Sequence, residues 1–120
     1  MSDCVKKFNA ADEFYFKEGC FIIEMLNDPV DADVSIAHAR VEAGKQTRWH
    51  WLDETFERYV ILKGKGLVEI GADDPATVRA GDVVIIPPQT RQRITNIGKG
   101  DLKFLAICSP RFSHRNYYYL

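Results

Sequence analysis

The chain reads GKQTRWHWLDETFERYVILKG over residues 44–64 and GDVVIIPPQTRQRITN over residues 81–96. Both stretches begin with glycine and contain runs of β-branched and aromatic residues, which favour extended backbone. In the second stretch the run stops at Pro87, because proline cannot donate to the hydrogen-bonded ladder of a central strand. Both stretches therefore predict short strands that are bounded by turns.

The rest of the chain shows the same organisation, with short apolar or alternating runs between glycine- and aspartate-containing turns. We expect strands at residues 20–26, 34–41, 47–52, 57–62, 66–70, 77–79, 83–86, 92–97 and 102–108. Gly64 lies in a connection that suits a β-hairpin, and residues 9–17 are compatible with a short helix. Many short strands predict an all-β sandwich or barrel, and periodicity alone does not choose between the two.

The two stretches resemble the signature motifs of the cupin superfamily, G-x5-H-x-H-x3-4-E-x6-G and G-x5-P-x-G-x2-H-x3-N. The matching residues, in chain order, are Gly44, His50, Glu57, Gly64, Gly81, Pro87 and Asn96. The chain departs from the motifs at Leu52 and Gln92, where histidines stand in the family, and at Gln89, where a glycine stands. The resemblance spans residues 36–109 and implies a double-stranded β-helix, or jelly-roll barrel. We expect one domain over residues 1–120, with a core at 34–109, a strand or short helix within 9–26 and a tail at 110–120.

The cupin resemblance implies metal ligands at His50, Glu57 and Gln92. These side chains offer an imidazole nitrogen, a carboxylate oxygen and an amide oxygen to a divalent ion such as manganese, iron, nickel or zinc. Because an amide is a weaker ligand than imidazole and Leu52 offers none, affinity should be lower than in the complete family set. The other interpretation is that the metal has been lost, so that His50 and Glu57 form a hydrogen-bonded pair and Gln92 satisfies their neighbours.

Strand alternation predicts which other side chains share the interior with His50, because residues two apart lie on one face. The expected inner wall comprises Arg48, His50, Leu52, Glu57, Tyr59, Ile61, Gln92 and Ile94. Arg48 would then anchor a carboxylate or phosphate, and Tyr59 could transfer a proton. The alternative is that Arg48 reaches the rim and pairs with Asp53 or Glu54.

The resemblance implies either an enzyme or a binding module. An enzyme of this kind would act on a small polar or anionic molecule by non-redox isomerisation, lyase chemistry or decarboxylation, with metal, Arg48 and Tyr59 as its active groups. The alternative is a barrel without metal that binds a small ligand, or that has a structural role and no catalytic activity.

Composition restricts the expected binding partners and cellular compartment of the protein. The chain has 120 residues, 46% of them apolar, and a net charge of −1, so an electrostatic affinity for nucleic acid or an anionic membrane is not expected. No apolar run approaches the roughly 18 residues that span a bilayer. Three widely spaced cysteines and the absence of a secretory signal predict a cytoplasmic protein with reduced thiols.

Aromatic side chains outside the motifs predict contacts on the outer surface. Trp49 and Trp51 alternate with His50, so we expect them, with Val60, to pack between sheets or at a homodimer interface. The aromatic and basic tail over residues 111–120 is expected to lie across the barrel mouth or on a partner, with His114 at the surface.

Overall fold

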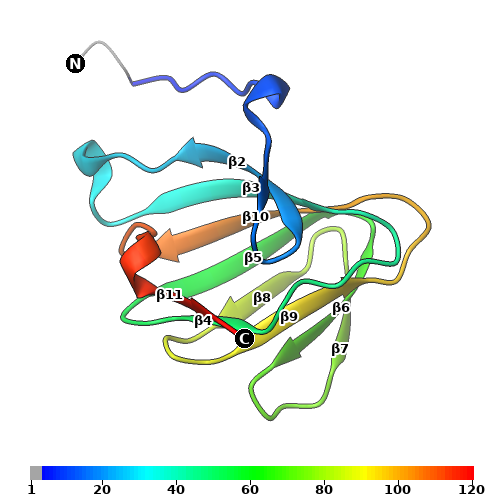
Figure 1. Ribbon diagram of the computed structural model, residues 1–120. Coiled ribbons are helices and arrows are strands. Elements are labelled where there is room, and N and C mark those ends of the chain that lie inside the picture. Colours follow the sequence, from blue (N-terminus) through cyan, green and yellow to red (C-terminus); the bar gives the residue numbers. More distant parts are fainter. Residues whose placement is uncertain (1–3) are drawn as a thin grey trace.

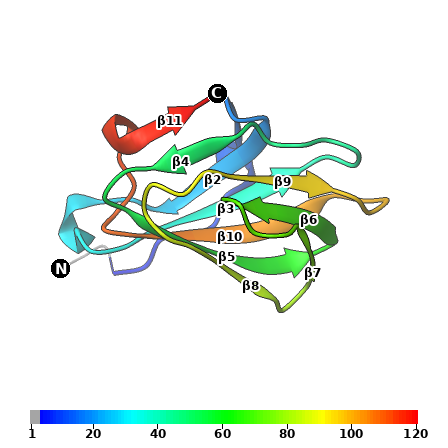
Figure 2. The same cartoon turned by 90° about the horizontal axis from the view of Figure 1, so that it is seen from below.

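The computed structural model describes residues 4–120, which form two antiparallel sheets that face each other (Figures 1 and 2). The first sheet contains, in order, β1 (Phe14–Phe16), β2 (Cys20–Leu26), β3 (Ser35–Val41), β10 (Leu102–Ser109), β5 (Phe56–Lys63) and β8 (Val83–Ile86). The second contains β11 (Tyr117–Tyr119), β4 (His50–Leu52), β9 (Gln92–Asn96), β6 (Lys65–Ile70) and β7 (Ala76–Arg79). Single 3-10 turns occur at η1 (Ala10–Asp12), η2 (Pro29–Asp31) and η3 (His114–Asn116). The expected all-β barrel is confirmed, and no helix within residues 4–120 is long and apolar enough to cross a membrane.

The structure corrects two local expectations, one for the segment at residues 9–17 and one for the connection at Gly64. The helix expected at residues 9–17 is limited to η1, because Glu13 returns to extended backbone and the following aromatic strand β1 pairs with β2. The Gly64 connection is not a hairpin, because β5 and β6 lie in different sheets. Gly64 has a φ of 93°, and a Cβ atom there would lie 2.8 Å from the Asp101 carbonyl oxygen. Glycine is therefore required where the chain crosses closely from one sheet to the other.

The interior is filled by alternate residues of strands from both sheets. Ile61 on β5, Ile94 on β9 and Leu102 on β10 are each at most 1% exposed and belong to one apolar cluster. On β8 the side chains alternate in the same way, so that Val84 and Ile86 are buried and their neighbours are exposed. Burial of this alternating set provides the main stabilisation of the barrel.

Gln89 replaces the motif glycine in the turn between β8 and β9. Its φ is 62°, in the left-handed region that glycine adopts without strain. The Gln89 N–H donates a 2.7 Å hydrogen bond to the Leu52 carbonyl oxygen, which ties the turn to the end of β4. The backbone at Gln89 therefore adopts a conformation that suits glycine, which costs a residue with a side chain about 1 kcal/mol or more.

Asn96 joins three segments at the end of β9. Its Nδ2 donates hydrogen bonds of 2.8 Å to the carbonyl oxygens of both Val41 and Gly100, and its Oδ1 accepts one of 2.9 Å from the Gly98 N–H. The side chain is 1% exposed. Both N–H donors of the amide are used and its oxygen accepts one hydrogen bond, which gives a structural reason for asparagine at this motif position.

We expect Asn96→Asp to lower the free energy of unfolding by about 3 kcal/mol, because a buried carboxylate would face two carbonyl oxygens in place of the donating amide. Urea denaturation at neutral pH measures the change. Asn116→Asp is the matched control, because Asn116 uses backbone atoms for its hydrogen bonds in η3 and with Asp53. Equal losses in the two variants would contradict the role given to the Asn96 amide.

Candidate functional site

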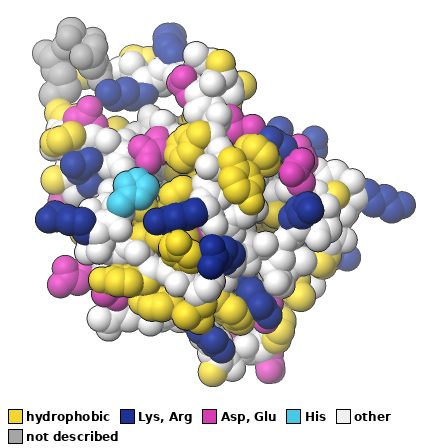
Figure 3. All heavy atoms as spheres, viewed as in Figure 1, with side chains coloured by type: hydrophobic (Ala, Val, Ile, Leu, Met, Phe, Trp, Pro, Cys, Tyr) yellow, Lys and Arg dark blue, Asp and Glu magenta, His cyan; other side chains and the backbone are white. Residues whose placement is uncertain are grey.

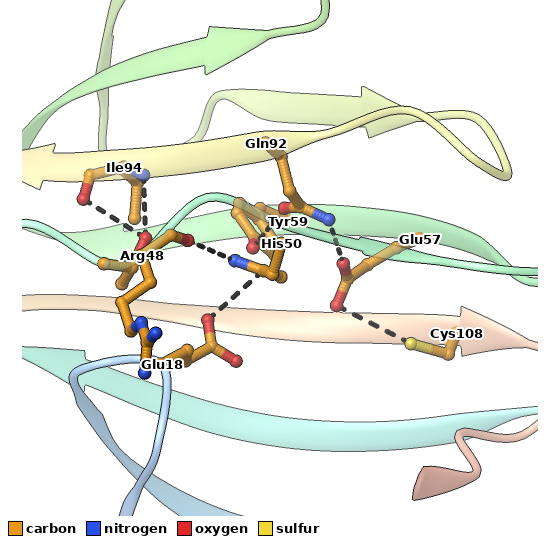
Figure 4. A network of polar contacts seen from close by, with 9 residues as sticks. Glu18, Arg48, His50, Glu57, Tyr59, Gln92, Ile94 and Cys108 are labelled. Atoms are coloured by element: carbon orange, nitrogen blue, oxygen red, sulfur yellow. Dashed lines mark hydrogen bonds and ion pairs between the residues drawn. The ribbon is translucent and has the colours of Figure 1, made fainter. Parts of the chain in front are cut away.

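Four of the polar side chains expected in the interior come together on β4, β5 and β9. His50 is paired in register with Gln92, and Gln92 Nε2 donates a 2.7 Å hydrogen bond to Glu57 Oε1 (Figure 4). Tyr59 donates its hydroxyl hydrogen to Gln92 Oε1. All four side chains are at most 8% exposed. The amide of Gln92 is therefore fixed between an acceptor and a donor, and its orientation is set by both.

Glu57 is a buried carboxyl group whose hydrogen-bond partners are uncharged. Its Oε1 accepts from Gln92, and its Oε2 lies 3.7 Å from the thiol sulfur of Cys108. Burial raises the pKa of Glu57, whereas His50 and the Gln92 hydrogen bond act in the opposite direction. The Glu57 carboxyl group therefore keeps its proton to a higher pH than an exposed glutamate does.

His50 makes one hydrogen bond to backbone and one contact to a carboxyl group. Its Nδ1 lies 2.7 Å from the Arg48 carbonyl oxygen, which can only accept, so Nδ1 carries a hydrogen. Its Nε2 lies 3.2 Å from Glu18 Oε2. Burial raises the pKa of Glu18 and the nearby imidazole opposes this shift. A single proton can therefore lie between Glu18 and His50, on either group.

Glu18 is the site residue that sequence reasoning missed. It lies in the turn between β1 and β2, just before Gly19, whose φ is 101°. The Glu18 carbonyl oxygen accepts a 2.7 Å hydrogen bond from the Arg48 N–H, which holds the turn against the segment that leads into β4. The only local signal is an acidic residue before a turn glycine, and such residues are usually solvated.

Arg48 does not point into the barrel, so the expected anion anchor is wrong. The regular strand β4 begins only at His50, and the buried position before it is taken by Thr47, which exchanges hydrogen bonds with the backbone of Ile94. Arg48 is exposed, donates a 3.0 Å hydrogen bond from Nε to the Leu120 carbonyl oxygen, and lies 4.2 Å from the Tyr119 ring centroid. The alternation of strand faces therefore fails in the irregular segment before β4.

A cavity of about 70 Å³ adjoins the buried polar groups. Glu18, Glu57, Tyr59 and Cys108 form part of its wall, and aromatic side chains from β1, β10 and the C-terminal segment form much of the remainder. Ala37 and Ala106, which are paired in register on β3 and β10, leave the space open on one side. The barrel therefore contains an apolar hollow with few polar groups, which is the usual form of a small-molecule site.

The C-terminal tail extends the second sheet of its own chain. Strand β11 pairs with β4, and the Tyr117 ring stacks on His50 at 5.7 Å. Trp51 stacks on Tyr118, and Arg91 and Arg93 lie over Trp49. Basic and hydrophobic side chains lie next to one another on the face of the molecule shown in Figure 3. The two tryptophans are thus half-buried beneath parts of the same chain.

The arranged side chains do not fit the metal centre of the family motif. Leu52 offers no ligand atom, Gln92 Oε1 accepts from Tyr59, and His50 Nε2 faces Glu18 rather than Glu57. Within residues 4–120 no three His, Cys, Asp or Glu side chains converge on a point that could hold a metal ion. Ligation by His50, Glu57 and Gln92 stays a prediction, and it would require these hydrogen bonds to rearrange.

The fold and the polar inner wall define a small double-stranded β-helix barrel. The family model for the cupin domain matches residues 37–108, and the chain belongs to the cupin family. An uncharacterized protein of Methanocaldococcus jannaschii, MJ1618, is 33% identical over 112 residues, which cover 92% of this chain and 89% of that protein.

Solved structures confirm the fold. An uncharacterized conserved protein with a double-stranded β-helix domain from Klebsiella pneumoniae aligns with a TM-score of 0.78 at 14% identity, and the alignment covers 96% of each chain. Pac13 of Streptomyces, described as a nucleoside dehydratase, aligns with a TM-score of 0.75 at 18% identity over 95% of this chain and 89% of that one. At these identities the likeness is one of architecture.

We expect Glu57→Gln to change how stability depends on pH. In the unfolded chain Glu57 ionises near its ordinary pKa of 4.5, whereas the folded protein holds the proton to higher pH. Between these pKa values the folded state binds more protons, so the wild-type free energy of unfolding falls as the pH rises through this window. Glu57→Gln removes that contribution, and the variant should gain stability relative to wild type as the pH rises from about 4 through this window.

Urea denaturation across this pH range measures the difference between variant and wild type. Glu42→Gln, which alters an exposed carboxylate beyond the end of β3, is the control. Parallel pH curves for wild type and Glu57→Gln would show that Glu57 titrates as an exposed group does.

Proposed function

We propose that this cupin binds a small organic molecule in the cavity beside Glu18 and Glu57, and that it does so without a resident metal ion. The observation that carries this proposal is the presence of two carboxyl groups on the wall of one largely apolar cavity, Glu57 buried and Glu18 with 12% of its side chain exposed. A core that served packing alone would be more stable with apolar residues at these places. Buried titratable groups beside a cavity are typical of functional sites.

The cavity suits a compact ligand. Its volume of about 70 Å³ exceeds the space that one water molecule needs and matches a ligand of only a few non-hydrogen atoms. Phe104 and the two cavity alanines provide apolar contact, while Glu18 and Glu57 provide hydrogen bonding. The carboxyl groups would fix the orientation of the ligand and the apolar wall would supply most of the contact area.

The same groups support proton-transfer chemistry. A carboxyl group with a raised pKa can donate a proton at a higher pH than an exposed glutamate does and take it back, as general acid–base catalysis requires. His50 can hold the proton that Glu18 releases. The pKa of Tyr59 is raised well above its ordinary value by burial, so in this proposal Tyr59 orients Gln92 and Gln92 orients Glu57. The reaction class that follows is a non-redox isomerisation or elimination.

Metal-dependent chemistry is the second candidate, because His50, Glu57 and Gln92 are retained side by side. We expect wild-type protein, purified without chelator or affinity tag, to contain far less than one equivalent of manganese, iron, nickel or zinc by elemental mass spectrometry. Leu52→His combined with Gln92→His restores two imidazoles at inward-facing positions and should bind zinc or nickel more tightly. Near-stoichiometric metal in wild type that falls in Glu57→Gln would overturn the metal-free proposal.

Ligand binding in the cavity is tested by thermal denaturation with a library of small amines, alcohols and carboxylic acids. At ten times its dissociation constant, a ligand should raise the free energy of unfolding by about 1.4 kcal/mol and the melting temperature by several degrees. Ala106→Leu fills the cavity from β10 and should abolish the response. Compounds that stabilise both proteins equally bind elsewhere, and a library without any selective compound would count against the proposal.

A further inference from the structure

We propose that the occupant of the cavity is a small organic cation, such as a protonated alkylamine, held between the Glu18 and Glu57 carboxyl groups and the neighbouring aromatic rings. This inference rests on the proposed function, because it names the charge and chemical class of the ligand that the same cavity would bind. It replaces the anionic ligand that an inward-facing Arg48 would have implied.

The charges around the cavity are acidic. Among residues 4–120 no lysine or arginine lines it, whereas Glu18, Glu24 and Glu57 do. Glu24 is exposed on β2, so it adds negative charge beside the accessible part of the cavity. A carboxylate in apolar surroundings is strongly stabilised by a cation at contact distance, because the local dielectric constant is low. An anionic ligand would meet like charge on this wall.

The carboxyl groups lack a cationic side chain that could neutralise both of them. Glu18 meets the imidazole of His50 through Oε2, which lies 3.2 Å from Nε2. The partners of Glu57 are the neutral amide of Gln92 and the thiol of Cys108. A ligand ammonium group would therefore supply the positive charge and the N–H donors that the protein does not.

Two basic side chains near Glu18, Lys17 next to it in sequence and Arg48 bonded to its carbonyl oxygen through the backbone, are engaged by aromatic and backbone groups. Lys17 Nζ lies over the rings of Tyr117 and Tyr119, at 5.0 and 5.2 Å. Arg48 binds the Leu120 carbonyl oxygen and stacks on the same Tyr119 ring. Both cations are thus engaged with the C-terminal strand, and neither lines the cavity.

Aromatic rings complete the features that recognise a cation. Phe14, Phe16, Tyr59, Phe104 and Phe112 all line the cavity, and the Tyr59 and Phe104 rings are neighbours at 4.3 Å. The face of an aromatic ring attracts an alkylammonium group electrostatically while also making apolar contact with its carbon atoms. Carboxyl groups and aromatic rings together therefore favour a cation over a neutral molecule of the same shape.

Three probes with four non-hydrogen atoms each separate the effect of charge from that of size: isopropylammonium, 2-propanol and acetate. Each is titrated into the wild-type protein at neutral pH and equal ionic strength, and backbone amide shifts of Ala37, Ala106 and Cys108 are followed by NMR. We expect isopropylammonium to bind at least about tenfold more tightly than either of the others.

Three variants test whether the preference for isopropylammonium depends on Glu57 and on the cavity. Glu57→Gln should reduce the preference for isopropylammonium over 2-propanol to about threefold or less, because a neutral amide replaces the carboxylate that attracts the ammonium group. Glu42→Gln should keep the full preference. Ala106→Leu should block all three probes at the cavity amides.

Equal binding of 2-propanol, or tighter binding of acetate, would overturn the inferred ligand charge and leave the proposed binding function intact. If none of the three probes shifts the cavity amides of the wild-type protein, both the ligand class and the binding function are wrong. Shifts that persist in Ala106→Leu would place binding outside the cavity, with the same consequence.

Discussion

Keeping the Glu57 carboxyl group inside the barrel is the constraint on which the polar interior depends. An ionised carboxylate removed from water is destabilised by several kcal/mol unless partners compensate it. Here the compensation is neutral: Gln92 donates to it, and Tyr59 fixes the amide from its other end. Because these three residues come from β5 and β9, which lie in opposite sheets, the hydrogen-bonded chain also joins the two halves of the barrel.

The departures from the cupin motif act on this same chain of contacts. A histidine at Gln92 or Leu52 would present a ring nitrogen toward the interior, whereas the actual residues present an amide that is already occupied and an aliphatic side chain. His50 consequently turns its Nε2 toward Glu18. The interior thereby lacks two imidazoles of the family motif and places a second carboxyl group, Glu18, beside His50.

Most of the fold could be predicted from the sequence, because most of the chain forms regular strands. Buried and less buried residues alternate from Glu57 to Ile61 on β5 and along β9. The burial of Tyr59, Gln92 and Ile94 could therefore be predicted from the sequence. Alternation gave the wrong side for Arg48, because residues before His50 are irregular and Thr47 bonds there to Ile94. Glu18 could not be predicted at all, since its role comes from a turn that tertiary contacts alone bring to His50.

The cavity reveals a conflict between stability and recognition. Burial raises the pKa of both Glu18 and Glu57, so at neutral pH the folded protein is less stable than it would be with apolar residues at these positions. Small side chains at Ala37 and Ala106 forgo further packing at the same place. A cationic ligand would relieve both penalties at once, because it fills the space and supplies the opposite charge. Binding would then stabilise the folded protein, because the ligand would interact with the folded state and not with the unfolded chain.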